Sequence, residues 1–294
     1  MQLSWFITLS YSFLFFSIMC LWSPPVYRLR QVPLWVVFAG IACGLALLSR
    51  QLDFPALLPL ALLAAALYYA QKKEAPLPGR FLAVAIILLL SFGLGAHAIP
   101  YFHNLKVLSG AVISKNAVPF TLYLNFDKAF VGLFILGISH RLITTKKDWL
   151  AILKQTLPFS LIFAVLLLFS AWLSGKINVE PKLPEILPLW LINNLLIVSV
   201  AEEAFFRGFV QKKLSLAFAR YSWGTWASLT LASLLFGFAH YAGGIAYSAW
   251  GTLAGFGYGW IYQKTGHIEA AIIAHFCLNL LHILLFTYPV LSGS

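Results

Sequence analysis

The sequence predicts an all-α polytopic membrane protein with about ten transmembrane helices. Hydrophobic residues make up 61% of the 294-residue chain, and charged residues make up only 10%. A soluble globular protein is nearer half apolar and a quarter charged, so this chain lacks the polar side chains needed to cover a surface in water. The apolar residues also fall into about ten runs, most of them close to the ~20 residues that a helix needs to cross a bilayer.

The ten runs follow one another along the chain with short polar linkers between them. The first has no Lys or Arg before it and no small-residue cleavage site, so we interpret it as an uncleaved span rather than a secretory signal. The fifth is interrupted by Asn125, Asp127 and Lys128, and its membrane part is expected to begin earlier, near Pro119. The expected spans are Leu3–Trp22, Leu34–Ser49, Phe54–Ala70, Phe81–Ile99, Ala129–His140, Leu150–Leu173, Ile186–Phe209, Trp223–His240, Ile245–Tyr262 and Ile268–Tyr288.

The basic residues predict the orientation of these spans. The chain has 20 Lys and Arg against nine Asp and Glu, a net charge of +11, but they cluster in linkers and form no stripe along a polar helix. They therefore indicate topology and contact with anionic lipid, and no nucleic-acid partner is expected. Both termini are expected outside the cytoplasm, with Pro100–Lys128 as an outer loop that is either a lid or a linker. The bases assigned to cytoplasmic linkers are Arg28, Arg30, Lys72, Lys73, Arg80, Arg141, Lys146, Lys147, Lys212, Lys213, Arg220 and Lys264.

Two adjacent carboxylates, Glu202 and Glu203, lie within the seventh run, and Arg207 follows close behind. An ionisable residue within the hydrocarbon is costly and is a candidate for function by default. On an α-helix Glu203 and Arg207 are i and i+4 and can pair, whereas Glu202 points about 100° away from Glu203. We therefore expect one carboxylate to be neutralised while Glu202 faces a cavity. The alternative is a buried ion pair that only holds helices together.

Polar side chains recur in the eighth and tenth runs. His240 ends the eighth run, where a histidine with a purely interfacial role is also common. In the tenth run His275 and Asn279 are i and i+4 and share one helix face, which His282 continues. This alignment predicts a polar cavity or a partner helix, and hydrogen bonding between helices remains the alternative for His275 and Asn279.

The ninth run carries Gly251, Gly255 and Gly259 at intervals of four residues. Small residues at this spacing allow two helix backbones to approach closely in a membrane. We interpret this glycine face as a packing surface.

Three short motifs follow one another along the chain: Glu202-Glu203-x-x-x-Arg207, Phe236-x-x-x-His240 and His275-x-x-x-Asn279. Together and in this order, they resemble the three motifs of the CAAX-protease family, the Abi or Rce1-like intramembrane glutamic endopeptidases. The resemblance covers roughly Pro184–Tyr288. It implies a division into N-terminal transmembrane helices of unassigned role, 1–180, and a catalytic core, 181–294.

The resemblance also implies a role for each residue of the three motifs. Glu202 and His240 would activate water, His275 and Asn279 would form the oxyanion hole, and Glu203 and Arg207 would hold the site together. The chemistry agrees, because a carboxylate or imidazole can remove a proton from water and N–H groups can stabilise a developing oxyanion. The expected partners are the lipid bilayer and a membrane-associated protein or peptide substrate, and the expected location is the bacterial inner membrane.

Three other functions are open from the sequence. A zinc-dependent membrane protease could use Glu202, His240 and His275 as ligands, although the chain has no His-Glu-x-x-His spacing. A noncatalytic scaffold or bacteriocin-immunity protein would keep the motifs without turnover. A transporter would use the polar residues as a binding site, but it usually shows internal repeats. No cofactor or metal is expected, and the isolated Cys20, Cys43 and Cys277 form no disulfide framework or Cys-based metal motif.

Overall fold

A computed structural model describes residues 2–24, 28–29, 32–72 and 74–293 of the chain. The described residues are mostly helical and divide into two compact units. Unit 1 comprises Met1–Leu105, Leu124–Thr145 and Leu196–Phe205, and unit 2 comprises Lys106–Tyr123, Lys146–Leu195 and Phe206–Ser294. The proposed functional division at residue 180 stays a prediction.

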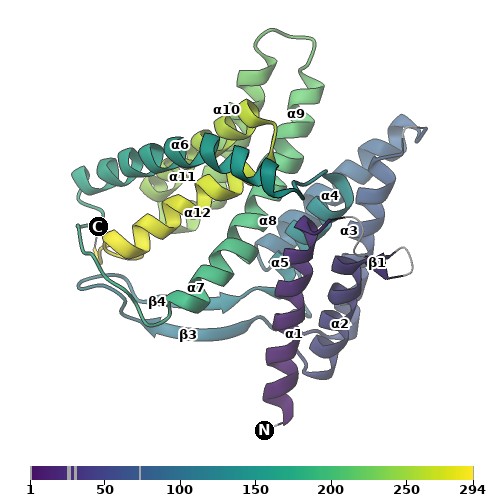
Figure 1. Cartoon of the computed structure of the whole chain (residues 1–294), viewed down its shortest axis with the longest axis horizontal. Coiled ribbons are helices and arrows are strands. Elements are labelled where there is room, and N and C mark those ends of the chain that lie inside the picture. Colours follow the sequence, from purple (N-terminus) through teal and green to yellow (C-terminus); the bar gives the residue numbers. More distant parts are fainter. Residues whose placement is uncertain (1, 25–27, 30–31, 73, 294) are drawn as a thin grey trace. The chain divides into compact units, whose positions relative to one another are not determined.

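In unit 1, helices pack around α5, most of whose residues are buried (Figure 1). Helix α1 packs on α2, α3 packs on α4, and α5 contacts α1, α3, α4 and α8. An antiparallel pair of two-residue strands joins α1 to α2. The elements are α1 (Gln2–Met19), η1 (Cys20–Trp22), β1 (Arg28–Leu29), β2 (Val32–Pro33), α2 (Leu34–Leu48), η2 (Phe54–Ala56), α3 (Leu57–Ala70), α4 (Leu77–Gly95), α5 (Phe126–Ser139) and α8 (Val200–Glu203).

In unit 2, α11 packs against α6, α10 and α12, and α12 packs along α6. A two-stranded ribbon precedes these helices in the chain (Figure 1). The elements of unit 2 or at its boundary are β3 (Leu105–Ala111), β4 (Phe120–Leu124), α6 (Lys146–Leu173), α7 (Leu187–Asn193), η3 (Asn194–Ser199), η4 (Ala204–Gln211), α9 (Lys212–Ala217), α10 (Gly224–Ala239), η5 (Tyr241–Gly243), α11 (Ile245–Thr265) and α12 (Ile268–Leu285).

All ten predicted runs contain a helix. Among the described residues, five helical segments are long and apolar enough to cross a membrane, at Trp5–Trp22, Leu77–Gly95, Lys146–Leu173, Leu187–Ala217 and Ile268–Leu285. Three further apolar helices are shorter, so the predicted count of about ten crossings is not confirmed.

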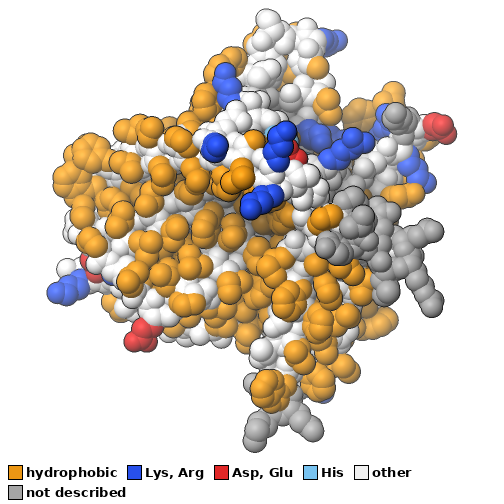
Figure 2. Space-filling view, in the orientation of Figure 1, with side chains coloured by type: hydrophobic (Ala, Val, Ile, Leu, Met, Phe, Trp, Pro, Cys, Tyr) orange, Lys and Arg blue, Asp and Glu red, His pale blue; other side chains and the backbone are white. Residues whose placement is uncertain are grey.

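Large hydrophobic side chains lie on the outside of α6, including Ile162, Val165, Leu166 and Phe169. Figure 2 shows hydrophobic side chains over much of the α6 and α12 side of unit 2. Lipid is a better solvent than water for such a surface. Together with the long apolar helices, this surface makes the chain an integral membrane protein.

The segment predicted as an outer loop, Pro100–Lys128, contains the β3–β4 ribbon. The connection between the two strands is bonded to the C-terminal tail, because Val118 N donates to Val290 O at 2.9 Å and Tyr288 N donates to Ser114 Oγ at 2.9 Å. Burial raises the pKa of the Tyr288 hydroxyl well above its ordinary value, and this hydroxyl accepts a hydrogen bond from Trp190 Nε1 at 3.1 Å.

One prediction about the linkers is wrong, and another rests in part on residues that the structure does not describe. The fifth helix begins at Phe126, so the prediction that its membrane part starts near Pro119 is wrong. Residues 120–124 form a strand instead, whose side chains alternate in burial as the two-residue period of a strand requires. Of the basic residues used to predict orientation, Arg30 and Lys73 lie outside the described residues.

Candidate functional site

A cavity of about 160 Å³ lies within unit 2, between α6, α10, α11, α12 and the C-terminal tail. Its polar wall includes three of the predicted site residues, namely His240, His275 and Asn279. The rest of the wall is mostly apolar or aromatic, with Leu167, Leu168, Ala171, Ile177, Phe236, Tyr247, Trp250, Ala254, Tyr258, Leu278 and Val290. The structure thus brings together the polar residues of the second and third motifs on one cavity.

His240 follows directly after α10, and its ring is anchored by the last turn of that helix. Its Nδ1 lies 2.8 Å from the carbonyl oxygen of Phe236, and its ring centroid lies 4.6 Å from that of Phe236. A carbonyl can only accept a hydrogen bond, so Nδ1 carries the proton in this contact. Nε2 is then the basic nitrogen of the neutral imidazole. When the ring is neutral, this contact assigns Nε2 as the proton-accepting nitrogen of His240.

His275 lies near the middle of α12 and is buried, at 4% exposure. Its ring stacks on Tyr258 with a centroid separation of 4.8 Å and an interplanar angle of 10°. The ring of Phe236 meets it edge-on at 5.9 Å. These two contacts from α11 and α10 fix the orientation of the imidazole at the cavity wall.

Asn279 lies one turn after His275, as the i, i+4 spacing predicts. Its Nδ2 donates to Asn194 Oδ1 at 3.3 Å, so a second amide from η3 helps to orient it. His282 also lines the cavity, but its Nε2 contacts the carbonyl of Thr287 at 3.1 Å and its ring meets Tyr288 edge-on. His282 therefore ties α12 to the C-terminal tail.

Arg207 is completely buried in unit 2. Its Nη2 donates to the carbonyl of Gly255 at 2.8 Å, and its guanidinium lies 4.4 Å from the centre of the Phe236 ring and 5.4 Å from that of Tyr258. Phe236 thus contacts Arg207, His240 and His275. Through this ring the guanidinium is linked to His240 and His275.

The glycine face of α11 makes the Arg207 contact possible. A Cβ on Gly255 would lie 2.9 Å from Arg207 Nη2, and a Cβ on Gly259 would lie 2.6 Å from Gln211 Oε1. Gln211 repeats the contact one turn later, because its Nε2 donates to Gly259 O at 3.0 Å. The predicted packing role of the glycines is confirmed, and the packing also brings two buried polar side chains to backbone carbonyls.

Glu202 and Glu203 belong to unit 1 and lie at the end of α8, within the continuous helical run Leu187–Ala217. Two π-helical segments, η3 and η4, flank α8 in this run. Such segments are rare and are often found at functional sites. Glu203 is completely buried, and its predicted pairing with Arg207 stays a prediction.

Glu202 has a charged partner that the sequence did not indicate. Its Oε1 lies 2.6 Å from Lys128 Nζ, and the two side chains are only 13% and 16% exposed. The predicted arrangement, in which one carboxylate is neutralised while Glu202 faces a cavity, stays a prediction, and the structure adds that Glu202 itself has a charged partner. Lys128, assigned from sequence to an outer loop, lies in the first turn of α5.

Within the described residues, no group of three or more His, Cys, Asp or Glu side chains is arranged to hold a metal ion. The chemistry open to the cavity residues themselves is proton transfer at His240 and hydrogen bonding at His275 and Asn279. Sequence reasoning did not assign five residues that contact the predicted site residues or the glycine face. In unit 2, Phe236, Tyr258 and Asn194 contact predicted site residues, and Gln211 packs on the same glycine face as Arg207; in unit 1, Lys128 contacts Glu202. Three of these residues had a signal in the sequence. Phe236 belongs to the second motif, Gln211 lies one turn after Arg207, and Lys128 is a charged residue beside an apolar run.

Comparison with known families identifies the C-terminal part of the chain. Residues 184–281, about a third of the chain, match the family model described as type II CAAX prenyl endopeptidase Rce1-like. All six predicted site residues lie within this segment, and the predicted family is confirmed. Comparisons with curated proteins and with solved structures gave no match.

Proposed function

We propose that this membrane protein, which carries an Rce1-like CAAX endopeptidase domain, hydrolyses peptide bonds of membrane-associated or lipid-proximal substrates with water activated by Glu202 and His240. The observation that carries the proposal is the placement of His240, His275 and Asn279 on one cavity. Hydrolysis needs a base to take a proton from water and N–H groups to stabilise the oxyanion, and these three residues can supply both.

In this proposal His240 Nε2 accepts a proton from the attacking water, because Nδ1 is held by the Phe236 carbonyl. The Glu202 carboxylate shares this task. General-base catalysis of this kind contributes about 10²–10⁴-fold to a rate. The proton then passes to the departing amine, so the peptide bond breaks and the site returns to its starting state.

His275 and Asn279 are proposed to donate to the oxyanion that forms when water attacks the carbonyl. Stacking on Tyr258 and the bond to Asn194 hold the two side chains before substrate binds. Preorganised donors are effective because they need no reorientation during the reaction. Removing one such donor costs about 10²–10³-fold in other acyl-transfer enzymes.

The substrate is proposed to be an apolar or lipid-bearing peptide segment at the membrane. The cavity wall is largely aliphatic and aromatic, and Lys176 adds a cation to it. An apolar segment gains free energy by filling such a cavity, and the lysine favours a neutral or anionic group beside it. The bacterial inner membrane is the proposed location.

Comparative peptidomics tests this function. Membrane and secreted peptides would be compared between cells with the wild-type protein and cells with Glu202→Ala at equal abundance. We expect a defined set of cleavage products to disappear and their precursors to accumulate in the variant. Identical peptide sets from two folded proteins would favour a noncatalytic scaffold or immunity protein instead.

A further inference from the structure

Lys128 occupies an unusual position for a lysine. It lies in the first turn of α5, where Phe126, Asp127, Ala129 and Phe130 are all buried, and its own side chain is 16% exposed. Taking an ammonium group out of water is costly unless it is paired. A structural role alone would be served as well by an apolar residue, because replacing buried ion pairs by apolar groups is often neutral or stabilising.

The partner of Lys128 is Glu202, which is 74 residues further along the chain. The 2.6 Å separation between Nζ and Oε1 is that of a short, charge-assisted hydrogen bond. Both residues belong to unit 1, and α5 packs directly on α8. The contact therefore joins a proposed catalytic carboxylate to a helix outside the segment that matches the family.

Close packing of the two helices brings Lys128 within reach of Glu202. Gly132 is one turn after Lys128 on the same face of α5. A Cβ on Gly132 would lie 2.9 Å from the Cα of Ala201, the residue before Glu202. Since a backbone atom cannot move as a flexible side chain does, only glycine allows α5 to approach α8 this closely.

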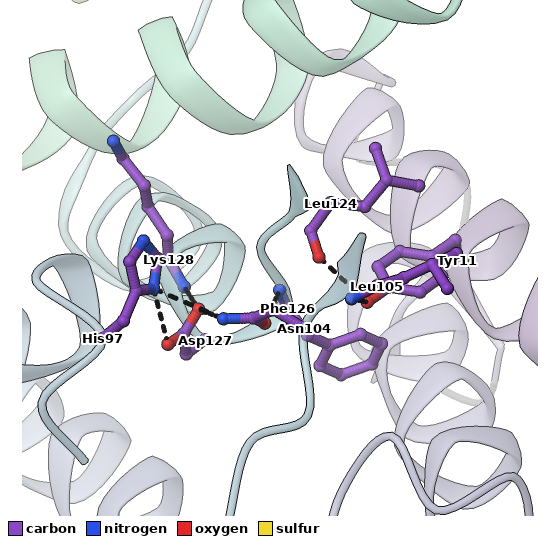
Figure 3. A network of polar contacts seen from close by, with 8 residues as sticks. All are labelled: Tyr11, His97, Asn104, Leu105, Leu124, Phe126, Asp127 and Lys128. Atoms are coloured by element: carbon purple, nitrogen blue, oxygen red, sulfur yellow. Dashed lines mark hydrogen bonds and ion pairs between the residues drawn. The ribbon is translucent and has the colours of Figure 1, made fainter. Parts of the chain in front are cut away.

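A polar network fixes the turn that carries Lys128 (Figure 3). The buried Asp127 carboxylate contacts His97 Nδ1 at 2.8 Å and accepts from Asn104 Nδ2 at 2.9 Å and from the backbone N–H of Lys128 at 2.8 Å. Asn104 Oδ1 in turn accepts from Phe126 N at 2.8 Å. In Figure 3 the Lys128 side chain extends away from these contacts, so the network anchors its backbone and leaves its ammonium group to Glu202.

We propose that Lys128 is a positioning residue of the peptidase site, which holds and orients the Glu202 carboxylate for water activation. This inference rests on the proposed function and extends it, because it gives the N-terminal helices a part in the site. The ammonium group acts through Glu202 and need not touch substrate.

The test combines kinetics and stability in purified full-length protein, with a membrane peptide found by the peptidomics experiment as the probe. Lys128→Met removes the charge and keeps the length of the side chain, and Lys128→Arg keeps the charge. Lys147→Met is the matched control, since Lys147 is exposed in the first turn of α6. We expect Lys128→Met to lower kcat at least about tenfold with KM within threefold of wild type. Lys128→Arg should restore most of kcat, and the control should match wild type.

A thermal double-mutant cycle with Glu202→Gln measures the pair without activity. Each single variant should lower Tm because it strands the other charge, and the double variant should lower Tm by less than the sum of the two. If the Lys128→Met protein is too unstable to accumulate but the double variant does accumulate, removal of Glu202 has relieved the loss of Lys128. That result also supports the pairing of the two charges.

The outcomes separate the two proposals. A cleaving wild type with an inactive Glu202→Gln and a fully active Lys128→Met would overturn the positioning role and leave the proposed function standing. Additive Tm changes would show that the two charges are not coupled and would also overturn it. A folded wild type with no peptidase activity on any precursor would overturn the proposed function, and the positioning role with it.

Discussion

Replacing Gly255 by Ala should break the contact that holds Arg207 in unit 2. The added Cβ would lie 2.9 Å from Arg207 Nη2 and 3.2 Å from Phe236 Cδ1, so at least one side chain must move. Arg207 is completely buried and its bond to Gly255 O is 2.8 Å long, so it has little room to adjust. Because Phe236 also contacts His240 and His275, the displacement should reach the cavity.

The size of the effect follows from these contacts. A hydrogen bond from a charged group contributes about 1.5–3 kcal/mol, and overpacking a core costs about 1–3 kcal/mol. Alanine in place of glycine within a helix stabilises the folded state by about 0.5–1 kcal/mol, which offsets part of this loss. The free energy of unfolding should therefore fall by about 2–5 kcal/mol, which corresponds to a fall in Tm on the order of 5–15 °C.

The assay is thermal unfolding of detergent-solubilised protein, followed by peptide cleavage below the Tm. Gly44→Ala in α2 is the matched control, because a Cβ there would meet nothing within 4 Å. The control should be as stable as wild type or slightly more stable. If Gly255→Ala and Gly44→Ala had the same Tm and activity, the Arg207 contact would have no part in holding the site.

Three further predictions concern charge, metal and topology. Glu202→Gln should lower Tm because Lys128 loses its partner, and Glu203→Gln should lower Tm because the predicted pairing would leave the buried Arg207 without its carboxylate. Both variants should lower cleavage in the same preparation. Purified protein should contain substoichiometric zinc by elemental analysis and should keep its activity in chelator. One tightly bound metal ion per chain, whose removal abolishes turnover, would instead favour a zinc-dependent protease. Reporter fusions after Lys147 should report cytoplasm and fusions at Lys115 the opposite side, and equal signals from both would refute the predicted orientation.

Much of the site could be predicted because its residues are close in sequence on single helices. The i, i+4 spacing placed His275 and Asn279 on one face of α12, and both line the cavity. Periodicity also identified Gly255 as a packing position, although not the arginine that packs on it. Helical spacing fixes which residues share a face but does not indicate which other helix meets that face.

The parts that could not be predicted depend on contacts between distant segments or on departures from α-helical geometry. Lys128 and Glu202 are far apart in sequence, and the short apolar stretch after Asp127 made the lysine look like a linker residue. The π-helical segments around α8 have no counterpart in the residue pattern. The ribbon had a signal that was missed, since the alternating Phe120–Leu124 stretch has the two-residue period of a strand.

The most direct measurement of the central claim is peptide cleavage by the His240→Gln variant in liposomes, beside wild type. His240 is on the cavity wall, its Nδ1 lies against the Phe236 carbonyl, and Nε2 is its proposed basic nitrogen. The account predicts a folded variant with a Tm near that of wild type and a cleavage rate lower by about 10²–10⁴-fold. A folded His240→Gln protein that cleaves the peptide at the wild-type rate would contradict it.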